Sequence, residues 1–150
     1  MNEMQASPWD NPRFRNWISV ARAGHAVERA VAQMLAPHDL KPAHLDLMMN
    51  VYRHPGFSQQ AIAQKLLVGR SNVTMLLPGL EKRDLVRREP DKADKRVLRL
   101  YLTDRGSALL AVLLKDYLVL IEKAMGESSP AECDLVGRTM DRVAKAMTPE

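Results

Sequence analysis

Cysteine is the scarcest residue with chemical consequences: Cys133 is the single thiol in 150 residues. One thiol excludes an internal disulfide framework and leaves no cysteine pair for a zinc site or a dithiol redox couple. The sequence also lacks an apolar run long enough to cross a bilayer, and residues 1–12 lack the apolar core of a signal peptide. We therefore expect a cytoplasmic protein.

Catalytic and metal-binding signatures are also missing. The four histidines, His25, His38, His44 and His54, do not show the spacing of metal ligands. The sequence contains no recognisable grouping of Ser, His and Asp, no phosphate-binding loop and no paired carboxylates in a catalytic setting. We therefore expect no enzyme activity, no bound metal and no cofactor.

The composition is that of a single globular domain over residues 1–150, with 46% hydrophobic and 27% charged residues. Its charge is unevenly distributed. Between Arg70 and Arg105 there are ten basic and six acidic residues, a net charge of +4 that equals the net charge of the whole chain. A local basic field of this kind favours a polyanionic partner, although a solvated basic face without a partner is the alternative.

Apolar residues that recur every three or four positions predict helices over about residues 12–36 and 42–53. Asn11 followed by Pro12 is a favourable start for the first helix, and Pro37 ends it. In the second helix we expect Leu45, Met48, Met49 and Tyr52 on the buried side.

Two shorter helices follow, over about residues 59–67 and from Ser71 onward, separated by a short turn. Ser58 is a suitable N-cap for the first of them. Two helices joined in this way predict a helix-turn-helix, with an ordinary helical hairpin as the alternative. Pro78 lies within the second helix, where it is expected to cause a kink.

A period of two then replaces the helical period, which predicts strands over residues 86–89 and 97–102 with a charged loop between them. A flexible basic ribbon beside a helix-turn-helix is a wing. Thr103 caps a very apolar helix over about residues 104–126, and a capping box at Ser129 begins the last helix. Helices this apolar need a covering that one small core does not supply.

These elements resemble the MarR family of winged helix-turn-helix transcriptional regulators over nearly the whole chain. The resemblance rests on three sequence segments: Leu80-Glu81-Lys82-x-x-Leu85-Val86, Asp94-Lys95-Arg96-Val97 and Leu102-Thr103-Asp104-Arg105-Gly106. The last two match the family's Asp-x-Arg, strand and Leu-Thr-x-x-Gly pattern.

The resemblance implies a mainly α fold of the α+β type. A winged helix-turn-helix lobe over about residues 42–103 would lie between dimerisation helices over about 1–36 and 104–150. It also implies a homodimeric repressor on a pseudo-palindromic operator of double-stranded DNA, whose half-sites are about one helical turn (~34 Å) apart.

Residues at the start of the predicted recognition helix are those expected to meet base edges in the major groove. They are Arg70, Ser71, Asn72, Thr74 and Met75. Asn72 and Thr74 facing solvent without a base contact is the alternative. The resemblance departs from the family at Met75, where Arg is frequent, and at Asp84, which replaces a glycine. Aspartate tolerates the left-handed conformation better than most residues.

In the resembling proteins the wing arginine, here Arg96, reaches the minor groove while the wing aspartate, here Asp94, holds it. A mutual surface ion pair is the alternative. We assign Arg87, Lys92 and Lys95 to phosphate contacts, which position a protein without reading sequence.

The resemblance further implies a small aromatic or anionic effector that binds between the dimer layer and the DNA-binding lobe. Candidate lining residues are Trp17, Arg22, His25, His44 and Met48, with simple packing as the alternative for each.

Two other functional hypotheses remain open. A redox switch through Cys133 is disfavoured by its acidic neighbours Glu132 and Asp134, which oppose the thiolate. A winged-helix module that binds protein instead of DNA is disfavoured by the basic wing.

Overall fold

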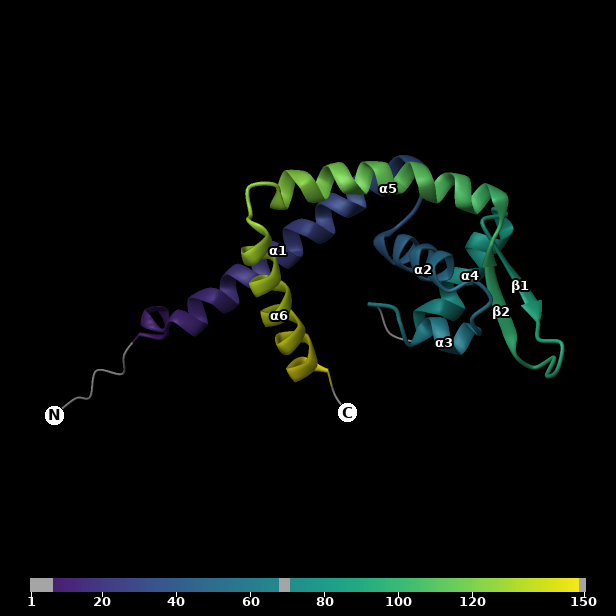
Figure 1. Cartoon of the computed structure of the whole chain (residues 1–150), viewed down its shortest axis with the longest axis horizontal. Helices are drawn as coiled ribbons and strands as arrows, with labels where there is room; N and C mark the ends of the chain where they lie inside the picture. Colours follow the sequence, from purple (N-terminus) through teal and green to yellow (C-terminus); the bar gives the residue numbers. More distant parts are fainter. Residues whose placement is uncertain (1–6, 68–70, 149–150) are drawn as a thin grey trace. The chain divides into compact units, whose positions relative to one another are not determined.

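The computed structural model describes residues 7–67 and 71–148 (Figure 1). The described elements, in chain order, are η1 (Pro8–Asp10), α1 (Pro12–Leu35), η2 (Ala36–His38), α2 (Pro42–Arg53), α3 (Gln59–Ala63), α4 (Ser71–Lys82), β1 (Val86–Pro90), β2 (Leu98–Leu102), α5 (Asp104–Met125) and α6 (Pro130–Met147). The fold is mainly α with one small sheet, which confirms the predicted class. None of the helices in the described ranges is long and apolar enough to cross a membrane.

The chain divides into two compact units, Met1–Leu114 and Lys115–Glu150, with the boundary inside α5. The first unit therefore holds α1 together with the predicted winged helix-turn-helix. The expected division into a lobe over residues 42–103 and flanking dimerisation helices stays a prediction.

Helix α1 begins and ends where the sequence predicts. The side chain of Asn11 accepts a hydrogen bond from the Arg13 amide at 2.9 Å, and Pro12 occupies the first helical position. Helix α2 begins at Pro42 and buries Leu45 and Met48 as expected. The expectation that Tyr52 is buried was wrong. Leu47 and Val51 face the core instead, and Tyr52 is 60% exposed.

Helix α3 begins as predicted, since the Ser58 hydroxyl accepts a hydrogen bond from the Ala61 amide at 3.1 Å. It ends at Ala63, four residues before the expected end. The reason is a long-range contact. The Leu67 amide donates a hydrogen bond to the buried Asp46 carboxylate on α2 at 2.8 Å, which fixes this segment outside a helical ladder. Burial raises the pKa of Asp46, and hydrogen bonds from Leu67 and Asn50 oppose that shift.

Helix α4 runs from Ser71 to Lys82 and includes Pro78, so the proline does not end it. Val73, Leu77 and Leu80 are buried along one face. Asp84 then adopts φ 55°, the left-handed conformation expected of the residue that replaces the family glycine.

The wing is an antiparallel pair in which Val86 lies opposite Leu102 and Pro90 opposite Leu98. The second edge of β2 is also occupied. The Gly56 amide donates to the Leu100 carbonyl at 2.9 Å, and the Leu100 amide donates to the Phe57 carbonyl at 3.0 Å. The wing is thereby joined to the segment that precedes α3.

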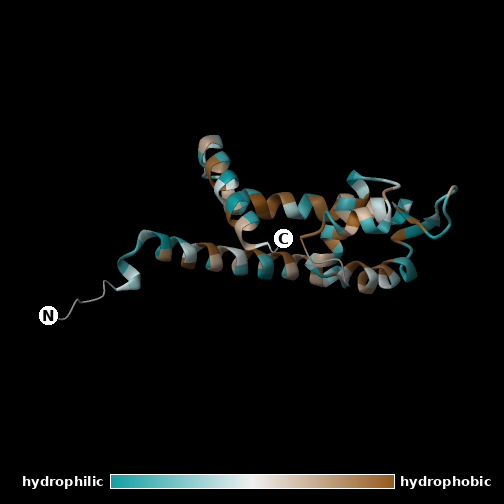
Figure 2. Ribbon diagram, turned by 90° about the horizontal axis from the view of Figure 1, so that it is seen from below, coloured by the Kyte–Doolittle hydropathy of each residue, from teal (hydrophilic) through white to brown (hydrophobic). Residues whose placement is uncertain are grey.

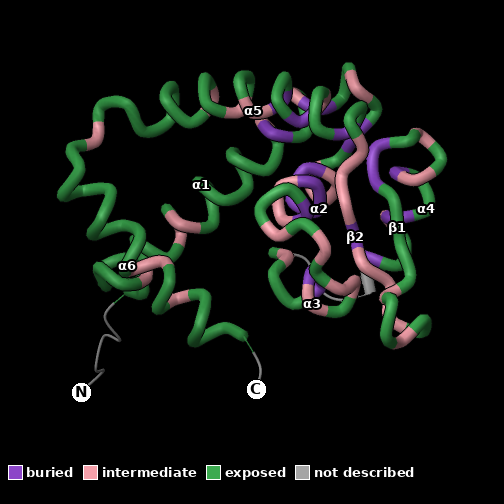
Figure 3. The backbone as a smooth tube through the Cα atoms, turned by 45° about the vertical axis from the view of Figure 1, so that its right-hand side comes forward, coloured by how far each residue is buried: buried purple, intermediate pink, exposed green. Residues whose placement is uncertain are grey.

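The hydrophobic core of the first unit surrounds α2, where Figure 3 shows the buried positions gathered. Its fully buried side chains come from α1 through α5, and the larger ones are Leu35, Leu45, Leu47, Met48, Ile62, Leu77, Leu80, Leu85, Leu100, Leu110 and Leu113. Thr103 caps α5 as predicted, because its hydroxyl accepts a hydrogen bond from the Gly106 amide at 2.9 Å.

The second unit is different, since no side chain in its described part, residues 115–148, is buried. Hydrophobic residues nevertheless recur along its helices (Figure 2). The large exposed ones are Leu118, Val119, Ile121, Met125, Leu135, Val136 and Met147. The predicted capping box is present, with the Ser129 amide donating to the Glu132 carboxylate at 2.8 Å.

Gly106 provides a test of the junction between α4, the wing and α5. A Cβ atom at this position would overlap the carbonyl oxygen of Leu85, which belongs to the backbone and has no rotamer with which to move away. We expect Gly106→Ala to lower the free energy of unfolding by about 1–3 kcal/mol, as overpacking does. Urea unfolding monitored by circular dichroism measures the change.

Gly24→Ala in α1 is the matched control, because a Cβ there meets nothing within 4 Å. Alanine in a helix interior should stabilise by up to about 1 kcal/mol. A Gly106→Ala variant as stable as the parent protein would show that the junction is not close-packed.

Candidate nucleic-acid interface

The outward face of α4 carries the residues predicted to read bases. Thr74 and Met75 are exposed, and Met75 is 79% exposed despite its apolar side chain. Ser71 and Asn72 form the first turn of the helix, and their side chains are outside the described residues, as is the whole of Arg70. The described part of this face thus presents one hydroxyl and one thioether to solvent.

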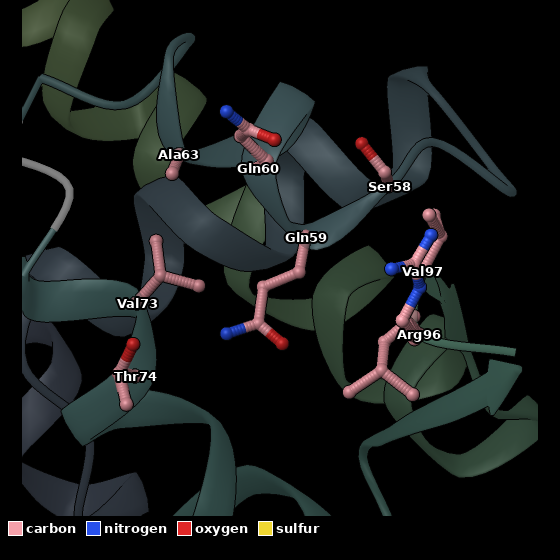
Figure 4. A pocket seen from close by; sticks show the side chains of 9 residues that line it. Ser58, Gln59, Gln60, Ala63, Val73, Thr74, Arg96 and Val97 are labelled. Atoms are coloured by element: carbon pink, nitrogen blue, oxygen red, sulfur yellow. The ribbon is translucent and has the colours of Figure 1, made fainter. Parts of the chain in front are cut away.

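A concavity of about 450 Å³ lies between the start of α3, helix α4 and the wing (Figure 4). The Gln59 side chain extends between Val73 and Thr74 on one side and Arg96 and Val97 on the other. The lining is formed by Ser58, Gln59, Gln60, Ala63, Val73, Thr74, Arg96, Val97 and Leu98. Hydroxyl, amide and guanidinium groups therefore converge on this concavity, and none of the lining side chains that the structure describes is acidic.

Thr74 and Arg96 were predicted from the sequence to contact DNA, whereas Gln59 and Gln60, which line the same concavity, were not. Both glutamines belong to the first turn of α3. The available signal was the N-cap Ser58, which fixes the next residues as the start of a helix beside the recognition helix.

Arg96 and Asp94 form a bidentate ion pair at the tip of the wing. The Nε and Nη2 atoms of Arg96 lie 3.0 Å and 3.1 Å from the two carboxylate oxygens of Asp94. The Arg96 side chain is 90% exposed, so the pair adds little stability. Its effect is on geometry and charge: it orients the guanidinium, and it holds the pKa of Asp94 below its usual range.

The guanidinium group of Arg99 links the wing loop to the turn that precedes α3. Arg99 donates from Nε to the Asp91 carboxylate at 2.5 Å and from Nη1 to the Gly56 carbonyl at 2.8 Å. The other Asp91 oxygen accepts hydrogen bonds from the amides of Ala93 and Asp94, both at 3.0 Å. The hydrogen bond from Arg99 is the main reason that the pKa of Asp91 is lowered.

These contacts form a continuous path from Gly56 through Arg99, Asp91 and Asp94 to Arg96. From the sequence, Arg99 was included only among the ten basic residues between Arg70 and Arg105, and no contact was predicted for it. The period of two in the strand was the available signal, because it places Arg99 on the opposite face from Leu98 and Leu100.

The remaining predicted phosphate contacts lie along the wing. Lys92 and Lys95 are exposed in its loop. Arg87 on β1 is exposed, forms an ion pair with Glu89, and has its guanidinium 4.5 Å from the centre of the Tyr101 ring. Its charge is therefore partly neutralised by a neighbour, whereas the loop lysines are presented to solvent.

The five candidate effector residues occupy three different settings. Trp17, Arg22 and His25 are exposed on α1, and Trp17 is 52% exposed. His44 is half-buried at the start of α2, and Met48 is fully buried in the core.

The described residues show one exposed thiol and no grouped set of metal ligands. Cys133 is an exposed free thiol on α6. Across residues 7–67 and 71–148, no three His, Cys, Asp or Glu side chains are grouped closely enough to hold a metal ion.

Comparisons with known proteins agree with this arrangement. A family model described as "MarR family" matches residues 38–97, from the end of η2 to the wing. The transcriptional regulator HosA of Escherichia coli O157:H7 is 31% identical over 97 residues, which cover 65% of this chain and 72% of HosA. The HTH-type transcriptional regulator TtmR of Methylorubrum extorquens is 33% identical over 92 residues, which cover 61% of this chain and 47% of TtmR. The alignment thus spans about half the length of TtmR.

A solved structure of the transcriptional repressor CouR bound to a 23-mer DNA duplex superimposes with a TM-score of 0.77. It is 26% identical, and the superposition covers 95% of this chain and 99% of CouR. The wing, the helix-turn-helix and the relatives that share them lead to one conclusion: the chain belongs to the MarR family of transcriptional regulators.

Proposed function

We propose that this protein is a homodimeric repressor that binds a pseudo-palindromic operator in double-stranded DNA and releases it in response to a small molecule. The observation that carries the proposal is the concavity in which Thr74 of α4, Gln59 of α3 and Arg96 of the wing converge. The concavity has uncharged polar side chains at its centre and a guanidinium group at its edge. This arrangement suits a complex in which α4 lies in the major groove and the wing lies against the adjacent DNA.

The chemistry of each side chain gives it a role on DNA. The major groove, about 12 Å wide, admits α4, so Thr74 and Met75 face thymine methyl groups and Gln59 can pair with an adenine edge. Arg96 projects from the wing toward the minor groove, where a narrow groove attracts arginine. Lys92 and Lys95 contribute phosphate contacts, which make the binding dependent on salt. CouR, which shares this fold, is known in complex with a DNA duplex.

The second unit supports the proposed dimer, because it has apolar side chains but no buried one in its described part. Leu118, Val119 and Leu135 are 63%, 71% and 58% exposed. Exposed apolar surface on this scale is covered in most proteins by a partner. A second copy of this chain is the partner proposed here. A closed symmetric dimer also presents two winged helix-turn-helix lobes to two DNA half-sites about one helical turn (~34 Å) apart.

The proposed response to an effector rests on the space around the start of α2. Half-buried His44 borders a cavity that also touches α4, so a ligand at that place contacts the helix that reads DNA. Trp17, Arg22 and His25 on α1 and Met48 in the core remain further candidates for ligand contact.

Replacing the wing arginine tests DNA recognition. We expect Arg96→Ala to weaken binding to the DNA upstream of the protein's own gene by about 5- to 150-fold, the loss that corresponds to about 1–3 kcal/mol. The slope of log affinity against log salt should fall by about one. The operator affinity of Arg96→Lys should lie between those of the parent protein and Arg96→Ala. Lysine keeps the positive charge but lacks the planar set of N–H donors of the guanidinium group. Fluorescence anisotropy over a range of salt concentrations measures both quantities.

Lys123→Ala removes the same charge from the second unit and serves as the control, with binding expected to be unchanged. An Arg96→Ala variant that binds as tightly as the parent protein would contradict the groove contact. If the parent protein binds no DNA and instead captures a protein, the module is a protein-interaction winged helix.

Substitutions in the second unit test the dimer. We expect Leu118→Glu, or deletion of the residues after Ser128, to give monomers or insoluble protein, because either change removes apolar surface that a second copy covers. Leu118→Met keeps that surface and should remain dimeric. Sedimentation velocity measures the assembly. Stable dimers of the Leu118→Glu variant that still bind operator DNA would contradict this part of the proposal.

A further inference from the structure

The outward face of α4 is apolar at its centre. Within residues 73–82 the exposed positions recur at the spacing of one helix face. They are Thr74, Met75, Pro78, Gly79 and Lys82. Met75 lies opposite the buried side of the helix and is 79% exposed, and exposed Pro78 follows it on the next turn. The thioether of Met75 and the ring of Pro78 therefore form an exposed apolar patch on α4.

The core of the protein does not use this apolar patch. Val73, Leu77 and Leu80, on the other side of α4, are 1%, 0% and 1% exposed and provide its packing. An exposed helix position is filled more favourably by alanine or by a long polar residue, and proline in a helix interior removes a backbone hydrogen bond. Residues that disfavour the local structure without serving the core are expected at sites that bind a partner.

Few groups on the described part of this face can pair with the polar edge of a base. Bidentate reading of guanine takes arginine or lysine, and bidentate reading of adenine takes asparagine or glutamine. Among the exposed positions of residues 73–82 the one cation is Lys82, about 10 Å from Met75 along the helix axis. The Thr74 hydroxyl is the one other polar side-chain group among these positions. The centre of the described face therefore offers apolar contact.

The C-terminal end of α4 is attached to its surroundings, which gives the apolar patch a defined direction. Arg83 donates to the carbonyls of His38 and Asp39 at 2.7 Å and 2.9 Å. Glu81 pairs with Arg88 of β1, with 2.7 Å between Oε1 and Nη2. Because these contacts join α4 to the α1–α2 connection and to the wing, the helix that carries the patch is preorganised for binding.

One group in the major groove matches an apolar patch. Thymine presents its C5-methyl group there, whereas the other base edges present hydrogen-bond donors and acceptors. Cytosine methylated at C5 carries the same methyl group on the same ring carbon, and unmodified cytosine and uracil lack it. A methionine side chain adapts to such a group because it is unbranched and its sulfur is polarizable.

We propose that α4 recognises the C5-methyl groups of pyrimidines in the major groove, with Met75 and the ring of Pro78 as the contact surface. Each operator half-site then carries thymine where Met75 lies, and 5-methylcytosine is accepted at that position in preference to cytosine. This inference rests on the proposed operator binding and specifies the chemical group that selects the operator. Lys92 and Lys95 add affinity at any sequence, whereas the methyl contact discriminates between sequences.

Replacement of thymine by deoxyuridine tests the methyl contact, because it removes one methyl group and keeps the base pair. The operator comes from the DNA upstream of the protein's own gene, and the thymines that the protein protects are replaced one at a time. We expect at least one position in each half-site where replacement weakens binding by about four-fold, the loss that corresponds to one buried methyl group. The slope of log affinity against log salt should stay the same, because the phosphate contacts are unchanged. Fluorescence anisotropy measures both quantities.

The same position is then occupied by cytosine or by 5-methylcytosine, each opposite guanine. Methylation should strengthen binding by about four-fold, since the two duplexes differ by that one methyl group. A hydrogen bond to the adenine of the original pair is absent from both duplexes, so it does not contribute to the difference.

Protein variants locate the contact. Met75→Ala should bind the thymine and deoxyuridine operators with equal affinity, because it lacks the side chain that meets the methyl group. Met75→Leu keeps an apolar side chain and should retain a preference of at least about two-fold. Pro78→Ala should reduce the preference by less than Met75→Ala does. Lys82→Ala changes the charge of the same face and is the control, which should discriminate as the parent protein does. Urea unfolding checks that each variant is folded.

Equal affinity for the thymine and deoxyuridine operators at every protected position would overturn the proposal. A preference that persists undiminished in folded Met75→Ala would overturn it too, because the methyl group then acts through DNA shape or through another side chain. A parent protein that binds no DNA would contradict the proposed function itself, whereas operator binding that is insensitive to the methyl groups contradicts this inference alone.

Discussion

The guanidinium of Arg99 joins the parts of the DNA-binding lobe that must be fixed relative to one another. It binds the Gly56 carbonyl in the turn before α3 and the Asp91 carboxylate at the start of the wing loop. Asp91 in turn accepts the amide of Asp94, which holds Arg96. The strand bonds between β2 and the segment before α3 fix the base of the wing, and this path fixes its tip. A preformed concavity between α3, α4 and the wing is the result.

The two units contribute differently to stability and to the proposed assembly. The first unit buries a leucine-rich core around α2, and the buried Asp46 carboxylate holds the amide of Leu67 after α3. The second unit carries large apolar side chains that are exposed in a single copy. The DNA-binding lobe thus has a core within one chain, whereas the apolar surface of the second unit is what the proposed second copy covers. In the proposed dimer, binding and assembly are linked, since two DNA-binding lobes on one dimer strengthen each other's binding to a palindromic site.

Sequence predicted the features that are decided locally. Asn11, Ser58 and Ser129 cap helices where expected, because an N-cap acts on amides two or three residues away. The end of α3 could not be predicted, since it depends on Asp46, which lies 21 residues before Leu67 in the chain. Of the candidate site, Thr74 was predicted from its place near the start of the recognition helix, and Arg96 was predicted from the Asp-x-Arg pattern. Gln59 and Arg99 were missed because their roles come from the meeting of α3 with the wing, which no local pattern contains.

If the protein binds operator DNA as proposed, Arg99 acts on recognition by positioning Arg96, and a double-mutant cycle tests this positioning most directly. Operator affinity is measured for Arg99→Met, Arg96→Ala and the double variant, with urea unfolding as the check on folding. Positioning predicts that Arg99→Met weakens binding by about ten-fold, within the range for one lost base contact, and that the double variant binds no more weakly than Arg96→Ala alone. Fully additive losses, or an Arg99→Met protein that binds as tightly as the parent, would contradict the account.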